Sequence, residues 1–185
     1  MKAFETELPG VFKIETQTYD DHRGYFRETY QQKKFNAIGI DRNFVQDNVS
    51  RSEKGVLRGL HFQEPSAQGK LVQVVWGEIF DVAVDVRLGS PNFGKWVGLE
   101  LADTAGSMLW IPEGFAHGFA VLSDSATVIY KTTEFWAPEA ERTIRWDDSD
   151  IGIDWPVTDP ILADKDANAP KLAEVRFLPK FHLRP

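Results

Sequence analysis

The sequence predicts a single all-β domain of the barrel or sandwich type. Between residues 11 and 130, short runs of β-branched and aromatic residues alternate with clusters of Gly, Pro, Asn, Asp and Ser, the pattern of strands joined by turns. Aromatic residues make up 12% of the chain, with 13 Phe and 6 Trp against 2 Met, and this composition suits packed β-surfaces. At 185 residues, one core can bury roughly 70% of the unfolded-chain surface, so we expect one domain over residues 1–185.

Ten strands are expected, each bounded by turn residues. They cover residues 11–16, 25–30, 44–49, 56–62, 71–76, 79–86, 95–101, 107–111, 119–122 and 126–132. One short helix is expected at residues 32–38, where Gly39 ends it. Beyond residue 135 the chain turns acidic and proline-rich, which predicts long connections with one short helical segment near residues 170–174. We find no fixed-period repeat, low-complexity tract or interdomain linker.

The clearest period-two alternation lies in the segment GEIFDVAVDVRLGSP. Its apolar face carries Phe80 and three valines, and its polar face carries Asp81, Asp85 and Arg87. If the sheet is open to solvent, the polar face is simply hydrated. If the barrel is closed and this face points inward, the same residues form a polar cavity wall. Both interpretations stay open.

Charge and composition exclude several classes of protein. The chain carries 21 Lys and Arg against 28 Asp and Glu, a formal net charge of −7, which argues against binding to nucleic acid or to an anionic membrane. Because there is no cysteine, thiolate catalysis, thiolate-bound metal and disulfides are excluded. Glu5 and Glu7 stand where the apolar core of a signal peptide would begin, and no apolar run is long enough to span a bilayer, so we expect a cytoplasmic protein.

Two of the four histidines stand in sequences that indicate a site. His22 lies in a turn, DDHRG, and His182 lies in the C-terminal FHLRP, and both contexts favour the surface. His61 lies in GVLRGLHFQ, where a Gly, five residues and a His form the start of the first cupin motif. His117 lies in IPEGFAHGF, whose Pro-x-Gly-x-x-His resembles the second cupin motif. In this order, on an all-β chain, they predict a cupin-type jelly-roll barrel with short peripheral helices.

A metal site is not expected in this barrel. A metal-binding cupin has a second His two residues after the first and a carboxylate a few residues later, but here these places hold Gln63, Ala67 and Gln68. Amide oxygens are poor ligands for the metals that imidazole selects, so a metal-dependent cupin oxygenase is disfavoured. The histidines are then free for proton transfer, since an imidazole with a reference pKa of about 6.5 suits that role at neutral pH.

The chain resembles the dTDP-4-dehydrorhamnose 3,5-epimerases over essentially its whole length. The segments that carry the resemblance are DDHRGYFRETY, QDNVSRS, GVLRGLHFQ, GKLVQVVWGEIFDVAVDVRLGSP, IPEGFAHGF, IYKTTEFW and ADKDANAP. The resemblance implies an isomerase without cofactor or metal, built as a homodimer of jelly rolls and acting on dTDP-4-keto-6-deoxyglucose. The hydrogens on carbons 3 and 5 of this sugar are both alpha to its carbonyl. Their inversion needs a base, an acid on the opposite face and a donor at oxygen 4.

The resemblance also implies roles for individual residues. It makes His61 the base and pairs it with Asp166, whose carboxylate would fix the tautomer and stabilise the imidazolium. It makes Tyr130 the proton donor and places Lys70 near the enolate oxygen. Without the resemblance, Asp166 would be interpreted as a turn residue, Tyr130 as a packing residue and Lys70 as a lysine at a strand edge. His117 and Asp81 match residues that support the sugar pocket.

Arg58 presents a geometric condition. In a strict strand Arg58 and His61 point to opposite faces, so both reach one pocket only if Gly59 permits a β-bulge.

The nucleotide end of the ligand calls for cations at the diphosphate and an aromatic at the base. By resemblance, the nucleotide side is formed by residues that come partly from across the dimer, namely Arg23, Phe26, Glu28, Gln46, Asp47 and Asn48. Glu141 and Lys165 match further binding positions, and Trp136 stands where many relatives have a tyrosine that stacks on thymine.

Two other functions remain compatible with the motifs. A single-centre epimerase of an unusual-sugar pathway would share His61, Asp166 and Tyr130, so only the stereochemistry of the product separates it. A non-catalytic cupin that binds a nucleotide sugar is disfavoured, because the chain retains all three of these residues together with Lys70.

Overall fold

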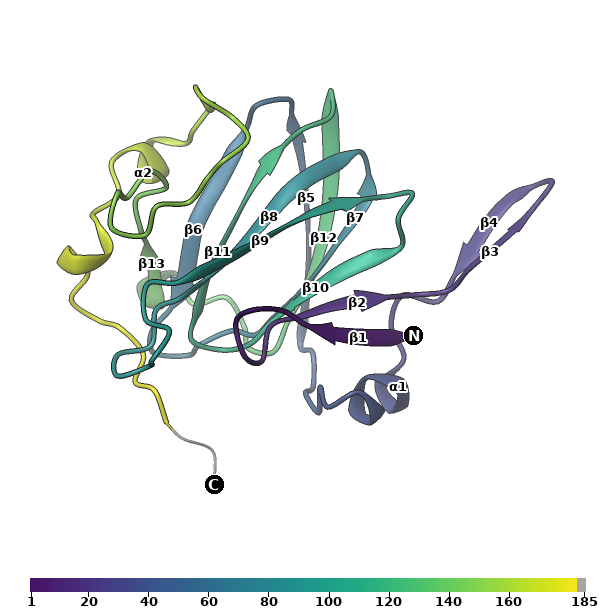
Figure 1. Cartoon of the computed structure of the whole chain (residues 1–185), viewed down its shortest axis with the longest axis horizontal. Coiled ribbons are helices and arrows are strands. Elements are labelled where there is room, and N and C mark those ends of the chain that lie inside the picture. The colour runs from purple at the N-terminus through teal and green to yellow at the C-terminus, as the bar shows by residue number, and fades with distance from the viewer. Residues whose placement is uncertain (183–185) are drawn as a thin grey trace.

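Two antiparallel sheets face each other in a jelly roll in the computed structural model, which describes residues 1–182 (Figure 1). The six-stranded sheet contains, in spatial order, β1 (Lys2–Glu5), β2 (Phe12–Glu15), β10 (Ser107–Ile111), β7 (Lys70–Trp76), β12 (Ser125–Thr132) and β5 (Gln46–Glu53). The five-stranded sheet contains β13 (Glu141–Thr143), β6 (Leu57–Gln63), β11 (Phe115–Val121), β8 (Glu78–Asp85) and β9 (Trp96–Ala102).

The remaining elements lie outside the two sheets. A hairpin, β3 (Thr18–Asp21) and β4 (Gly24–Arg27), projects from the barrel, as Figure 1 shows. Helix α1 (Gln32–Ala37) packs below the six-stranded sheet, α2 (Asp164–Ala167) lies in the C-terminal segment, and 3₁₀ helices occur at Pro138–Ala140 and Leu172–Glu174. No helix of the described chain is long and apolar enough to cross a membrane. The all-β jelly roll expected from the sequence is confirmed.

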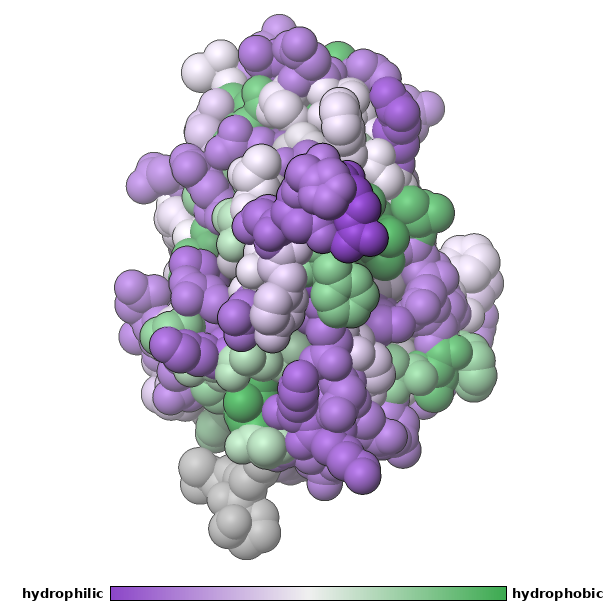
Figure 2. All heavy atoms as spheres, turned by 90° about the vertical axis from the view of Figure 1, so that its right-hand side faces the viewer, coloured by the Kyte–Doolittle hydropathy of each residue, from purple (hydrophilic) through white to green (hydrophobic). Residues whose placement is uncertain are grey.

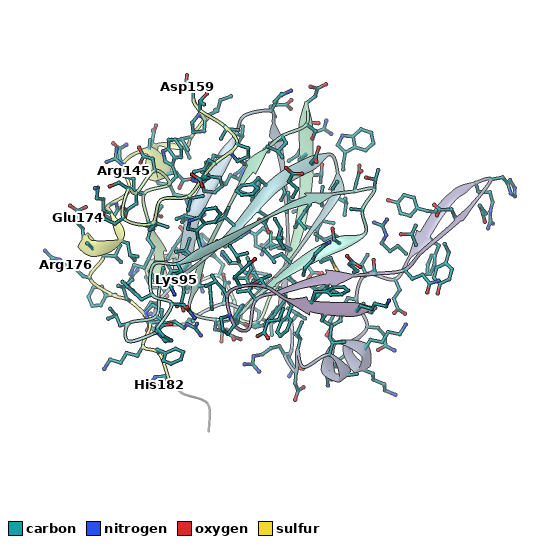
Figure 3. All side chains as sticks on the ribbon, in the orientation of Figure 1. Lys95, Arg145, Asp159, Glu174, Arg176 and His182 are labelled. Atoms are coloured by element: carbon teal, nitrogen blue, oxygen red, sulfur yellow. The ribbon has the colours of Figure 1, made fainter. Side chains whose placement is uncertain are left out.

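The five-stranded sheet is buried on both of its faces. Its inner face packs against the other sheet in a cluster that includes Ile79, Ala83 and Phe119. Its outer face is covered by the chain that follows β13, where Ile144 and Leu172 join the valines of β8 in a second cluster. We call residues 144–182, which follow β13, the C-terminal cover. Figure 3 shows on its outer surface Arg145, Asp159, Glu174 and Arg176. The long proline-rich connections are therefore a layer of the fold.

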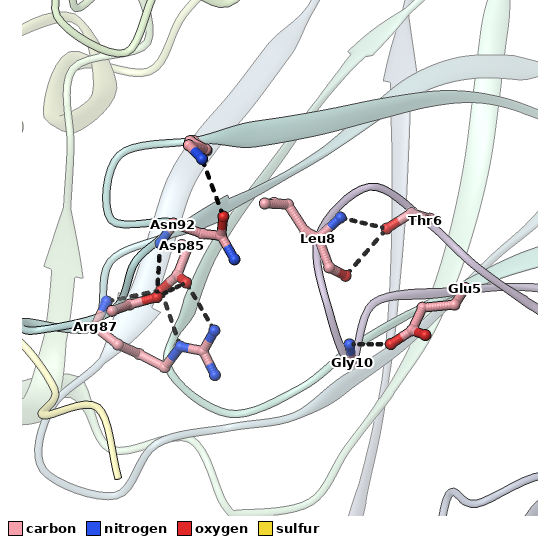
Figure 4. Close-up of polar contacts among 9 residues, drawn as sticks. Glu5, Thr6, Leu8, Gly10, Asp85, Arg87 and Asn92 are labelled. Carbon is pink, nitrogen blue, oxygen red and sulfur yellow. Dashed lines mark hydrogen bonds and ion pairs between the residues drawn. The ribbon is translucent and has the colours of Figure 1, made fainter. Parts of the chain in front are cut away.

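This double burial corrects the interpretation of the alternation in β8. The polar face is neither hydrated nor uniformly a cavity wall: Asp81 lies inside with His117, whereas Asp85 is buried in an ion pair with Arg87 beyond the strand end. Arg87 donates from Nε to Asp85 Oδ1 at 2.9 Å and from Nη2 to Oδ2 at 2.7 Å, and Ser90 donates to Oδ2 at 2.6 Å (Figure 4).

Several element boundaries differ from the sequence prediction. β1, β13 and α2 have only three or four residues each and carry too little pattern to be recognised. β5 runs over 46–53 instead of 44–49, because its polar residues alternate in exposure as regularly as apolar ones would. β11 begins at residue 115 and not at 119, because its Ala and Gly residues fit a strand buried on both faces. The helix at 32–37 and the turn at 172–174 agree with the prediction.

The Asp85–Arg87 pair generates a prediction about stability. Burial by itself would raise the pKa of Asp85, but hydrogen bonds from Arg87 and Ser90 outweigh it and hold the pKa below its usual range. We expect Asp85→Asn to lower the free energy of unfolding by about 2–4 kcal/mol at pH 7, because the guanidinium loses its buried partner. The contribution is complete above the ordinary carboxyl pKa of about 4 and is lost as pH falls through the depressed folded value.

Urea unfolding at a fixed protein concentration, at pH 7 and at the lowest pH where both proteins fold, measures this difference. Asp159→Asn at an exposed position is the control. A loss of stability that is equal at the two pH values, or absent at pH 7, contradicts the assignment.

Candidate active site

A cavity opens between the two sheets near one end of the barrel. It consists of two adjoining hollows of about 310 and 350 Å³, which share the lining residues His61, Lys70, Tyr130 and Glu141. His61 belongs to β6 of the five-stranded sheet, and Lys70 and Tyr130 belong to β7 and β12 of the six-stranded sheet. The two sheets therefore supply different titratable groups to opposite walls of one cavity.

His61 is held by a buried carboxylate. Its Nε2 lies 2.7 Å from Oδ1 of Asp166, and the backbone N–H of Gly59 donates to the other oxygen, Oδ2, at 3.2 Å. Burial would raise the pKa of Asp166, but these hydrogen bonds and the charge of Lys165 outweigh it and hold the pKa below its usual range. An ionised Asp166 accepts the proton on Nε2, so Nδ1 is the nitrogen of His61 with a free lone pair.

Burial lowers the pKa of His61 below its ordinary value, although the hydrogen bond and the charge of Asp166 act to raise it. The imidazole is therefore neutral at pH 7 and ready to accept a proton.

A β-bulge brings Arg58 and His61 into the same cavity, as the sequence required. In the pairing of β6 with β11, Arg58 faces Phe119 and His61 faces His117, so three steps along β6 match two along β11. Gly59 has φ = +124°, and a Cβ there would lie 2.5 Å from the Cα of Gly118. Only glycine fits this bulge.

Tyr130 lies on the six-stranded sheet and faces the cavity that His61 lines from the five-stranded sheet. It lies opposite Asn48 of β5 and Val72 of β7, and its side chain lines both hollows. Burial raises the pKa of its phenol, the charge of Arg58 lowers it and that of Glu141 raises it. The phenol is therefore protonated at neutral pH and available as a proton donor.

Lys70 is a buried cation whose ammonium makes one hydrogen bond within residues 1–182. Its side chain lines the cavity, and its Nζ donates to the backbone oxygen of His61 at 3.2 Å. Burial lowers its pKa to about 8, partly offset by the charges of Asp81 and Glu141. An ammonium with spare hydrogens in such a place can stabilise an oxyanion.

A second histidine–carboxylate pair lies beside the first. His117 Nε2 is 2.7 Å from Oδ1 of Asp81, and both side chains are buried. Oδ2 of Asp81 is buried without a hydrogen-bond partner in the described chain. His117 faces His61 across β6 and β11 and lines the larger hollow.

Other site residues expected from the sequence fall into two groups. The structure brings to the cavity Gln46, Asn48, Arg58, Trp136, Glu141 and Lys165. It leaves outside it, within one chain, Arg23, Phe26, Glu28 and Asp47. The first three belong to the hairpin or the chain just after it, where Arg23 pairs with Asp21 and Glu28 with Lys34. Asp47 points to the outer face of β5 and pairs with Lys131 at 2.9 Å.

Three polar residues that line the cavity were not assigned to a site from the sequence. Ser50 lines the larger hollow with its Oγ buried and unpartnered, and Gln63 and Gln68 line the smaller one. The alternation of Gln46, Asn48 and Ser50 along β5 was the signal that places Ser50 on the inner face. No group of three or more His, Cys, Asp or Glu side chains in residues 1–182 could hold a metal ion.

Comparisons with known proteins agree on one family. The model of a family described as dTDP-4-dehydrorhamnose 3,5-epimerase matches residues 5–174. The dTDP-4-dehydrorhamnose 3,5-epimerase of Shigella flexneri is 54% identical over 179 residues, covering 96% of this chain and 99% of that protein. The dTDP-6-deoxy-D-glucose-3,5-epimerase of Legionella pneumophila, crystallised with dTDP-4-keto-L-rhamnose, has a TM-score of 0.96 at 47% identity, covering 98% of this chain and 99% of that one.

A relative with a narrower activity is also similar. The crystal structure of a 3′-monoepimerase from Streptomyces bikiniensis, in complex with dTDP-quinovose, has a TM-score of 0.85 at 36% identity, covering 91% of this chain and 86% of that one.

The His61–Asp166 contact predicts a titration shift. We expect Asp166→Asn to lower the pKa of His61 further below its ordinary value, because burial still disfavours the imidazolium while the carboxylate no longer stabilises it. Histidine ring signals followed by NMR against pH report this pKa directly. Asp164→Asn, at an exposed position of α2, is the matched control and leaves the titration unchanged. A His61 pKa that stays constant or rises in Asp166→Asn argues against the dyad.

Proposed function

The chain belongs to the dTDP-4-dehydrorhamnose 3,5-epimerase family, and from this premise we propose that the cavity between its two sheets performs the epimerisation. The protein is an isomerase that acts on a nucleotide sugar, converting dTDP-4-keto-6-deoxyglucose to dTDP-4-keto-L-rhamnose. One observation carries the residue assignments: an imidazole and a phenol line the same cavity from opposite sheets. Inversion at carbon needs a proton to leave from one face and another to arrive on the opposite face.

His61 is the proposed base. Its Nδ1 takes the proton from carbon 3 or carbon 5. The electron pair of the broken C–H bond forms a double bond between that carbon and carbon 4, and the carbonyl π pair moves onto oxygen 4 to form an enolate. The resulting imidazolium is stabilised by Asp166, which already receives the Nε2–H bond at 2.7 Å. No oxidation occurs, so the proposed reaction needs no redox cofactor, and in this scheme the ammonium of Lys70 takes the place at oxygen 4 that a metal could otherwise hold.

Tyr130 and Lys70 complete the proposed exchange. The ammonium of Lys70 stabilises the enolate oxygen, and because its pKa is lowered only to about 8, most of it remains charged at pH 7. Tyr130 delivers a proton to the carbon from the face opposite His61, with the positive charge of Arg58 supporting the transient phenolate. His117 and Asp81 support the sugar from the wall beside His61.

The nucleotide end is proposed to bind at the mouth of the cavity. Lys165 and Arg58 supply positive charge there, Gln46 and Asn48 supply amides, and Glu141 pairs with Lys165 at 3.0 Å. The indole of Trp136 is 58% exposed while lining this opening, which makes it available to stack on thymine.

We infer that the working form is a homodimer. The hairpin holds Arg23 and the exposed rings of Tyr25 and Phe26 away from the chain's own cavity, and these groups suit a nucleotide bound by a second copy. Figure 2 shows apolar side chains gathered beside the hydrophilic hairpin on this side of the molecule. The outer face of the six-stranded sheet also exposes Val49 and Val75, an apolar surface that a second copy would cover.

The proposed setting follows from the substrate and the charge of the chain. A nucleoside diphosphate sugar is charged and does not cross lipid bilayers by itself, so we place the enzyme in the cytoplasm. The net charge of −7 disfavours nucleic acid and anionic membranes as further partners.

The function is tested with dTDP-4-keto-6-deoxyglucose in deuterated water. We expect the proton signals of carbons 3 and 5 to disappear and the doubly inverted keto sugar to form, because each inversion takes its incoming proton from solvent-exchanged groups. Inversion at one carbon alone would make the chain a single-centre epimerase. Binding without any exchange would make it a non-catalytic cupin, and either result contradicts the proposal.

Tyr130→Phe separates proton abstraction from inversion. The variant keeps the ring and removes only the hydroxyl, so we expect deuterium to enter at one or both carbons while little doubly inverted product accumulates. His61 working alone returns a proton to the face from which it came. Proton NMR of the same reaction measures both quantities. Formation of the doubly inverted sugar at the wild-type rate would remove Tyr130 from the mechanism.

A further inference from the structure

Three glutamine side chains hold the backbone of the segment that carries Trp136. They come from β5, β6 and the loop before β7, and they are Gln46, Gln63 and Gln68. We call them the glutamine clasp, and we call residues 134–137 the aromatic segment. All three line the smaller hollow of the cavity.

The clasp binds four consecutive residues of the aromatic segment. Gln68 Nε2 donates to the backbone oxygen of Glu134 at 2.8 Å, and Gln63 Nε2 donates to that of Phe135 at 3.1 Å. The N–H of Trp136 donates to Gln46 Oε1 at 3.0 Å, and the N–H of Ala137 donates to Gln63 Oε1 at 2.9 Å.

Apolar packing cannot fix this segment. The side chains of Phe135 and Trp136 are 62% and 58% exposed, so neither ring is anchored in a core. The segment is therefore held by hydrogen bonds, namely those of the clasp and one from the Thr132 hydroxyl to the backbone oxygen of Glu134 at 2.9 Å. Because the protein orders this segment before a ligand arrives, binding does not have to supply the ordering free energy.

Gln63 is the central member of the clasp. It is 4% exposed, and its Nε2 also donates to the backbone oxygen of Ser66 at 2.8 Å, so both amide hydrogens are used. It stands two residues after His61 on the same face of β6, yet it has no hydrogen left to donate to a ligand. Its influence on a ligand must pass through the aromatic segment.

We propose that the glutamine clasp is a positioning device that sets nucleotide affinity by presenting the Trp136 indole at the cavity mouth. The inference rests on the proposed function in one respect: the ligand stacked on the indole is the base of a nucleoside diphosphate. Gln63 is a positioning residue in this scheme, and its substitution acts on binding and leaves the proton transfers of His61 and Tyr130 in place.

A double-mutant cycle tests the proposal with Gln63→Met, Trp136→Ala and the double variant. Methionine keeps the length of glutamine and removes every hydrogen bond without adding charge near His61. Calorimetric titration with dTDP should show Gln63→Met weakening binding about 10-fold, from loss of buried hydrogen-bond partners. In the Trp136→Ala background the same change should have less than a 2-fold effect. With the keto sugar, KM should rise in parallel while kcat stays within about 2-fold.

A second measurement needs no ligand. Amide hydrogen exchange in the free protein should increase at Trp136 and Ala137 in Gln63→Met, because their acceptor is lost or displaced. Gln32→Met, at an exposed position of α1, is the matched control and should change neither exchange nor affinity. Gln68→Met removes a single bond and carries the test if Gln63→Met does not fold, with a weakening of about 3-fold expected.

The outcomes separate the clasp from the proposed function. If the wild type does not turn over the keto sugar, the proposed function fails, and the exchange measurement still decides whether the clasp holds the segment. Unchanged exchange in Gln63→Met overturns the clasp. An equal loss of dTDP affinity with and without Trp136, or a fall in kcat at unchanged KM, overturns its action through the indole.

Discussion

The carboxylate of Asp166 is the contact on which the arrangement of the site depends. One oxygen binds the imidazole of His61 and the other accepts from the N–H of Gly59, so a single side chain fixes both the proposed base and the bulge that orients it. Asp166 reaches this place only because the chain after β13 folds back over the outer face of the five-stranded sheet. The C-terminal cover thus connects the packing of the fold to the chemistry of the cavity.

The two-sheet architecture assigns chemically different tasks to opposite walls. The five-stranded sheet carries two histidines side by side, His117 paired with Asp81 of the same sheet and His61 paired with Asp166 of α2, and the six-stranded sheet carries the phenol of Tyr130 and the ammonium of Lys70. Burial pushes the pKa values of the imidazole and the ammonium down and that of the phenol up. The shifts keep the imidazole and the phenol neutral at pH 7, whereas Lys70, with a pKa of about 8, stays mostly charged.

The sequence predicted the features that depend on local pattern. The strands of the core follow from alternation, and the condition placed on Gly59 is met because only a bulge reconciles Arg58 with His61. The pairing of Asp166 with His61 came from the family resemblance, and the structure places the two groups in contact.

Features that depend on contacts between distant segments could not be predicted from pattern. The guanidinium of Arg87, which pairs with the buried Asp85, lies over the rings of Phe115 and Phe181. The alternation of β8 could not reveal these distant rings, so it indicated a wet or cavity-lining surface instead of a buried ion pair. The glutamine clasp could not be predicted from the sequence either, because the glutamines bind backbone atoms, which every residue type carries. Residues of the hairpin lie outside the cavity of their own chain, and only the family resemblance assigned them to the nucleotide side.

In the proposed mechanism one base, His61, removes the proton from both carbon 3 and carbon 5. The most direct measurement is the rate of hydrogen exchange at carbons 3 and 5 of dTDP-4-keto-6-deoxyglucose in deuterated water, catalysed by His61→Asn and followed by proton NMR. We expect exchange at both carbons to fall together, by on the order of 10²- to 10⁴-fold. Exchange at one carbon that continues at the wild-type rate while the other is lost would contradict it, because a second base would then exist.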